Sequence, residues 1–146
     1  MASPERVVVG VDGSPRSVAA LRWAADYAAH AGAAVRAVTG WQHPLRYRWE
    51  STLSDDELSE RAGRMLSETV DAALGTDPAV KVEESVVAGH PAQVLIDASG
   101  DARLLVLGSH GYAAVHGALL GAVSQYCVQH ARCPVVVVRG PVPAGA

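Results

Sequence analysis

A continuous β-branched run near the start of the chain constrains its fold more than any other feature. Residues 6–11 read Arg-Val-Val-Val-Gly-Val, with no polar residue between the valines. Alternating polar and apolar residues are typical of a strand with one face in water, whereas a continuous apolar run predicts a strand buried on both faces. Helices on both sides of a parallel sheet provide such burial. Ser14 and Pro15 then predict the N-cap and the first position of a helix.

The rest of the chain continues this alternation of strand and helix patterns. Further strands are predicted over residues 34–41, 80–88, 103–107 and 134–139, with further helices after Ser54, after Pro91 and over residues 121–132. This order predicts an α/β fold, a single doubly wound three-layer domain over residues 1–146 with its core at about 5–140 and a mostly parallel sheet. Ligands of such folds bind outside the carboxyl ends of the strands. One crevice could therefore collect Asp12, Gly40, Trp41, Gly89 and Gly108.

A glycine-rich loop follows the predicted strand at 103–107. Gly108-Ser109-His110-Gly111 is followed by nine residues and then by Gly121, where a helical pattern resumes. A loop between a strand and a helix exposes backbone N–H groups and the positive end of the helix, which together bind anions such as phosphate. Glycine permits the backbone to approach a ligand closely. The alternative is a tight connection that binds no ligand.

This spacing resembles the ATP-binding signature of the universal stress protein family, in the pattern G-x-x-G, nine residues, G. Further matches are the sequences at residues 9–14, 89–92 and 133–138, and the resemblance covers residues 5 to 140. The resemblance implies five strands in the order 3-2-1-4-5, a homodimer, and ATP as ligand, with any Mg²⁺ carried by phosphate oxygens. It implies a nucleotide site at the following residues: Gly10, Asp12, Gly40, Leu107, Gly108, Gly111, Gly121, Ala122, Val123 and Ser124.

The resemblance also assigns roles within this site. Asp12 would face the ribose and adenine, and the backbone at Gly40 would lie by the adenine. The glycine loop and the start of the next helix would hold the phosphates. The chain departs from the family pattern at Ala122, where the signature has serine or threonine. A hydrogen bond to a charged group contributes roughly 1.5–3 kcal/mol, so the missing hydroxyl corresponds to about ten-fold or more in affinity. The N–H groups of Ala122 and Val123 remain, and Ser124 supplies a nearby hydroxyl.

Composition narrows the classes of function. A net charge of -3 over 146 residues gives no overall attraction to nucleic acid or to an anionic membrane. No stretch approaches the roughly 18 apolar residues of a membrane span, and the first residues do not resemble a signal peptide. We therefore expect a soluble protein of a reducing cytoplasm. Cys127 and Cys133 do not form a disulfide framework, and the histidines lack metal-ligand spacing.

Three functions remain in competition. The leading one is an ATP-binding regulatory protein of the stress response, in which nucleotide biases a conformation or a surface for an unknown protein partner. The second is a slow ATP hydrolase. The glycine loop contains no Walker lysine and no arginine, and Lys81 is the only lysine of the chain. The third is a nucleotide-free dimerising scaffold, which the alanine at position 122 favours.

The last predicted strand suggests how two copies would associate. In the implied strand order, residues 134–139 lie at an edge of the sheet, and Val135 to Val138 carry no charge. Free N–H and C=O groups along such an edge favour pairing with another chain, and a two-fold axis lets the strand pair with its own copy. We therefore expect a homodimer through Val135 to Val138. The alternative is a monomer whose tail at 140–143 shields the edge, because prolines cannot extend a ladder.

Overall fold

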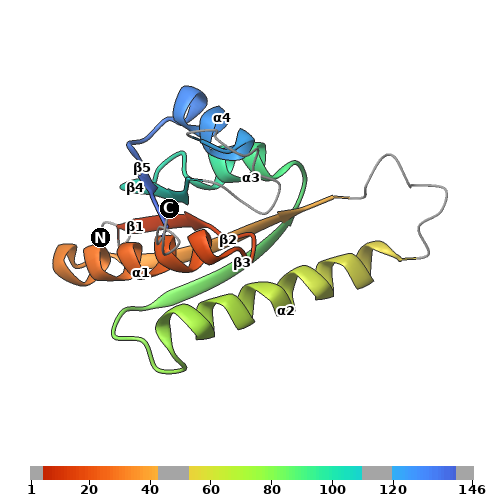
Figure 1. Cartoon of the computed structure of the whole chain (residues 1–146), viewed down its shortest axis with the longest axis horizontal. Helices are drawn as coiled ribbons and strands as arrows, with labels where there is room; N and C mark the ends of the chain where they lie inside the picture. Colours follow the sequence, from red (N-terminus) through yellow and green to blue (C-terminus); the bar gives the residue numbers. More distant parts are fainter. Residues whose placement is uncertain (1–4, 43–52, 110–119, 141–146) are drawn as a thin grey trace, which may run out of the picture.

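The computed structural model describes residues 5–42, 53–109 and 120–140. These residues form a parallel sheet with helices on both faces (Figure 1). In chain order the elements are β1 (Arg6–Gly10), α1 (Pro15–Ala31), β2 (Ala34–Trp41), α2 (Asp55–Leu74), β3 (Val82–Ala88), α3 (Pro91–Ala98), β4 (Leu104–Gly108), α4 (Ala122–His130) and β5 (Val135–Val138). The sheet order is β3-β2-β1-β4-β5, and every neighbouring pair is parallel. The predicted α/β fold and strand order are confirmed.

The central strand is buried on both faces, as its valine run predicts. Val7 and Val9 belong to an apolar cluster that α1 and α2 cover, and Val8 belongs to a second cluster that α3 and α4 cover. All three side chains have at most 1% of their surface exposed. Figure 1 shows the same layering, with α1 and α2 on one side of the sheet and α3 and α4 on the other. Burial of a valine on this scale contributes about 1.5–3 kcal/mol.

Local signals set the ends of the first two helices. The Ser14 side chain accepts a hydrogen bond from the Ser17 N–H at 3.3 Å, and Gly32 closes α1 in the left-handed conformation with φ at 68°. Ser54 caps α2 by accepting from the Glu57 N–H at 3.2 Å. Capping oxygens satisfy N–H groups that the first turn of a helix leaves without an intrahelical partner. The N-caps predicted at Ser14 and Ser54 are therefore confirmed.

Four of the five predicted strands and the last predicted helix differ from the structure by one or two residues at an end. The third strand begins at Val82 rather than at residue 80, and α4 ends at His130 rather than at residue 132. The last strand begins at Val135, because Pro134 has no N–H, although its carbonyl still accepts from the Leu105 N–H at 2.9 Å. The carboxyl ends of the first, fourth and last strands lie at Gly10, Gly108 and Val138, each one residue from its predicted place.

Both cysteines are free, and they differ in burial. Cys127 is fully buried in the cluster under α3 and α4, whereas Cys133 is partly exposed. Burial raises the pKa of the Cys127 thiol to about 11, because the apolar surroundings disfavour the thiolate. Cys127 is therefore a protonated core residue at neutral pH. Within the described ranges, no helix is long and apolar enough to cross a membrane.

Candidate functional site

The predicted site lies where the direction of strand order changes, at the carboxyl ends of β1 and β4. These two strands are neighbours, and Val9 pairs with Val106. The chain leaves β1 into α1 on one face of the sheet and leaves β4 toward α4 on the other face (Figure 1). Ligand crevices of doubly wound folds form at such switch points. The structure thus brings Gly10, Leu107 and Gly108 together at the carboxyl end of the sheet.

The turn between β1 and α1 fixes the carboxylate of Asp12. Its Oδ1 accepts a hydrogen bond from the Ser14 N–H at 2.9 Å, while the side chain remains exposed. Gly13 has φ at 84°, a conformation that other residues rarely adopt. The turn is anchored to β2, because the Thr39 hydroxyl donates to the Val11 carbonyl at 2.9 Å. The carboxylate of Asp12 therefore stands in a defined position beside the strand ends.

Hydrogen bonds join the two ends of the glycine loop. The Ser109 N–H donates to the Val138 carbonyl at 2.9 Å, and the Gly121 N–H donates to the Ser109 carbonyl at 2.6 Å. These bonds hold the start of α4 beside the ends of β4 and β5. Gly111 and His110 lie outside the described residues. The base of the loop is thus defined by Ser109 and Gly121.

The first turn of α4 carries the three residues predicted after Gly121. Ala122 is exposed, Val123 is partly buried, and Ser124 is buried. The Ser124 hydroxyl donates to the Gly108 carbonyl at 2.6 Å. Its single proton is therefore directed to the protein backbone, and the oxygen can act toward a ligand only as an acceptor. The first-turn N–H groups lack intrahelical acceptors and lie at the positive end of the helix dipole.

Two predicted site glycines have a packing role that the sequence did not show. A Cβ atom on Gly10 would lie 2.7 Å from Leu95 Cδ1 and 2.8 Å from Leu107 Cδ2. A Cβ atom on Gly40 would lie 2.9 Å from Pro91 Cα. Side chains at these positions would thus collide with α3 or with the core. Both glycines permit close packing of α3 on the sheet, whatever their relation to a ligand.

Sequence reasoning missed one charged residue at this edge. Arg16, in the first turn of α1, packs against Gly108, where the loop begins. Its position directly after Pro15 gave no sign of this contact, which depends on how α1 lies across the sheet.

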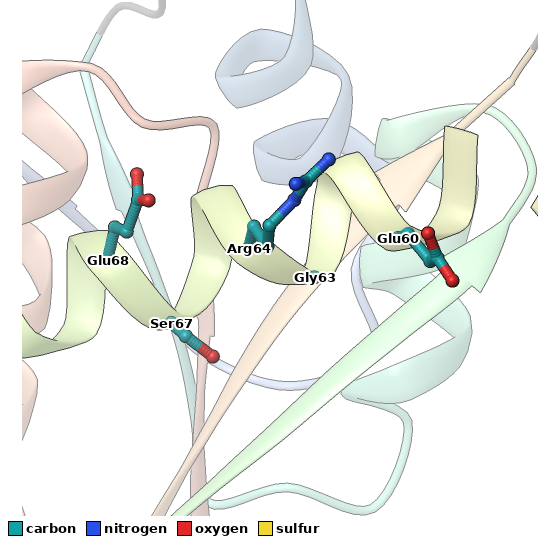
Figure 2. Close-up of a pocket in the computed structure, with 5 residues that line it drawn as sticks. All are labelled: Glu60, Gly63, Arg64, Ser67 and Glu68. Carbon is teal, nitrogen blue, oxygen red and sulfur yellow. The ribbon is translucent and has the colours of Figure 1, made fainter. Parts of the chain in front are cut away.

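A separate hollow lies on α2, away from these residues. It has a volume of about 540 Å³ and is lined by Glu60, Gly63, Arg64, Ser67 and Glu68. Figure 2 shows the lining residues along consecutive turns of α2. None of the predicted site residues contributes to it. In the described part of the chain there is also no group of three or more side chains that could hold a metal ion.

Comparison with known protein families matches residues 4–139 to the universal stress protein family. The chain belongs to this family. The match spans nearly all of the chain and includes both the β1–α1 turn and the loop between β4 and α4. Membership agrees with the resemblance that the glycine spacing indicated.

Named relatives support the same assignment. The chain is 36% identical over 133 residues to universal stress protein Rv2005c of Mycobacterium tuberculosis, covering 91% of this chain and 45% of the relative. It is 35% identical over 140 residues to universal stress protein Rv1996 of the same organism, covering 92% of this chain and 44% of the relative. The chain therefore spans less than half the length of these curated relatives.

Solved structures of universal stress proteins share the fold. UspA from Lactobacillus plantarum is 26% identical, with a TM-score of 0.73, covering 95% of this chain and 100% of that one. A universal stress protein in complex with cAMP is 27% identical, with a TM-score of 0.66, covering 96% of this chain and 100% of that one. Protein MJ0577 has a TM-score of 0.78 at 20% identity, covering 97% and 99%, and supports the fold alone.

Proposed function

We propose that this universal stress protein binds an adenine nucleotide, ATP, at the carboxyl ends of β1 and β4. The observation that carries the proposal is the joined base of the glycine loop. The Gly121-to-Ser109 and Ser124-to-Gly108 hydrogen bonds hold the start of α4 beside the strand switch point. N–H groups of the first turn of a helix bind phosphate at such positions. A relative that is 27% identical forms a complex with cAMP, which supports the adenine nucleotide class.

Each part of the nucleotide has a proposed position. The Asp12 carboxylate accepts hydrogen bonds from the ribose hydroxyls, and the backbone at Gly40 lies by the adenine. Gly10 and Leu107 line the strand ends between these two. The phosphates bind along Gly108, Gly111 and Gly121 and the first turn of α4, with any Mg²⁺ held by phosphate oxygens. Because the Ser124 proton points to Gly108, the N–H groups of Ala122 and Val123 are the donors we assign to the phosphates.

The proposed role is regulation in the stress response. Bound nucleotide would bias the conformation of the protein or the surface that an unknown protein partner binds. We place this role in the cytoplasm. Hydrolysis would be slow at most. Phosphoryl transfer depends on cations that neutralise charge developing on the phosphates. Lys81, the only lysine of the chain, cannot serve in this way, because it directly precedes β3 at the amino end of the strands, opposite the proposed site.

A nucleotide-free dimerising scaffold is the second candidate. Ala122 favours it, since this exposed position lacks the family's hydroxyl. The two candidates differ in whether the protein responds to nucleotide at all.

Thermal unfolding with added ATP separates these candidates. A ligand that binds only the native state raises the melting temperature as its concentration exceeds Kd. We expect ATP to raise the melting temperature of the wild type, and Gly121→Leu to abolish the rise because leucine blocks the approach of phosphate. Gly121 has φ at -73°, so its backbone accommodates leucine. Gln129→Leu, at an exposed position of α4, is the matched control and should respond like the wild type. No rise for the wild type at millimolar ATP would leave the scaffold as the function.

A gain of affinity at position 122 tests where the phosphates lie. Ala122→Ser restores the hydroxyl of the family pattern at the first residue of α4, and we expect it to tighten ATP binding about ten-fold. Ala122→Cys under reducing conditions is the control, since a thiol is a similar size but a weak donor. Titration calorimetry measures both. Equal affinity of the serine variant and the wild type would mean that the phosphates bind elsewhere.

We propose in addition that two copies pair through β5. Carbonyls of Pro134 and Val138 accept from β4. Backbone groups of a strand point alternately to its two sides, so the N–H and C=O groups of Val135 and Val137 face the open edge. In the described residues, β5 pairs with β4 alone. Pairing with a second copy would satisfy these groups and continue the sheet across a two-fold axis.

Substitution at Val137 tests this interface. Val137→Pro removes an N–H that faces the open edge and spares the bonds to β4, so we expect a monomer by light scattering at tens of micromolar. Val137→Thr keeps the N–H and should remain a dimer. A wild-type protein that is monomeric under these conditions contradicts the proposed dimer and favours an edge shielded by residues 140–143.

A further inference from the structure

The side chain of Arg16 lies across the ends of two strands. A Cβ atom on Gly108 would stand 2.9 Å from Arg16 Cβ and 3.0 Å from the Arg16 backbone carbon. A Cβ atom on Gly140, two residues past β5, would stand 2.5 Å from Arg16 Cγ and 3.4 Å from its Nε. Any larger residue at either position would displace the arginine. The stem of Arg16 therefore occupies space that two glycines leave, and this contact fixes its course along the carboxyl edge of β4 and β5.

The charged end of Arg16 is available to a ligand. Several other arginines hold protein partners, since Arg6 pairs with Glu83, Arg103 with Glu5, and Arg22 donates to the Ala73 carbonyl. Within residues 5–42, 53–109 and 120–140, no such bond or ion pair holds the Arg16 guanidinium. A long charged side chain characteristically packs its stem and keeps its head in water. Within these described ranges, Arg16 therefore combines a stem packed against Gly108 and Gly140 with an unpaired guanidinium.

This cation lies beside the base of the glycine loop. Gly108, on which Arg16 packs, is the last residue of β4, and Ser109 after it accepts from the Gly121 N–H. The carbonyl of Gly108 accepts from Ser124 in α4. Gly108 thus has α1 with Arg16 on one side and the first turn of α4 on the other. An anion held at the start of α4 would lie at the same edge of the sheet as the guanidinium.

We infer that Arg16 binds the terminal phosphates of the nucleotide and sets a preference for triphosphate over monophosphate. The inference rests on the proposed function and adds to it the residue that distinguishes nucleotides by charge. Guanidinium groups bind phosphate oxygens through paired N–H donors in a fixed plane. The α-phosphate is bound by backbone N–H groups that every nucleotide can use, whereas Arg16 contacts only the phosphates beyond it. The loop has no lysine, so Arg16 supplies the side-chain charge there.

Calorimetric titration of ATP and AMP into matched variants tests this role. Arg16→Met keeps an unbranched stem against Gly108 and Gly140 and removes the charge. We expect it to weaken ATP binding about ten-fold and to leave AMP binding unchanged. Arg16→Lys restores the charge and should recover much of the ATP affinity. Arg132→Met removes the same charge at an exposed position before β5, at the opposite edge of the sheet, and should change neither affinity.

Different failures of this experiment have different meanings. Equal loss of ATP and AMP binding in Arg16→Met, or no loss of either, would show that Arg16 has only a packing role. A melting temperature of the nucleotide-free Arg16→Met variant close to that of the wild type excludes misfolding as the cause of a loss. If the wild type binds neither nucleotide, the proposed function fails, and the role of Arg16 fails with it. If Arg16→Met loses ATP binding alone, both stand.

Discussion

Burial of β1 on both faces is the constraint on which the rest of this structure depends. Val7 and Val9 need one apolar cluster and Val8 needs another, so helices must cover both sides of the sheet. A chain that places its first two helices on one face and its last two on the other must reverse its strand order beside its first strand. Because of this reversal, the chain passes from β1 to a helix on one face of the sheet and from β4 to a helix on the other face. The reversal thereby places Asp12, after β1, and Gly108, at the end of β4, at the same end of the sheet.

Close packing accounts for much of the glycine pattern at that edge. Gly10 and Gly40 leave room for α3 and the core, and Gly108 leaves room for Arg16. Glycines at strand ends therefore serve the fold before they serve a ligand. The proposed ligand site rests instead on the hydrogen bonds from Gly121 and Ser124 to residues 108 and 109. These bonds hold the start of α4, with its first-turn N–H groups, beside the carboxyl end of β4.

The sequence predicted features whose causes are local. Continuous valines predicted the buried strand, and Ser14 and Ser54 predicted helix starts because a capping side chain acts on an N–H three residues away. The proton of Ser124 was not predictable, because its acceptor at Gly108 is brought near only when α4 folds onto β4. Arg16 was missed for the same reason, since its neighbours Gly108 and Gly140 lie far along the chain. Asp12 was placed at the site by its position after the first strand, and its role was implied by the family resemblance. Its carboxylate accepts a hydrogen bond from the Ser14 N–H, two residues along the chain.

Amide chemical shifts during an ATP titration test the central claim most directly, because they report where the nucleotide binds. Nitrogen-15 spectra of the labelled protein would follow each backbone N–H separately. The account predicts shifts that saturate together at Asp12, Ser109, Gly121 and Ala122, with no change at Ser67 and Glu68 in the hollow on α2. Shifts confined to α2, or no shifts at millimolar ATP, would contradict a nucleotide site at the carboxyl ends of β1 and β4.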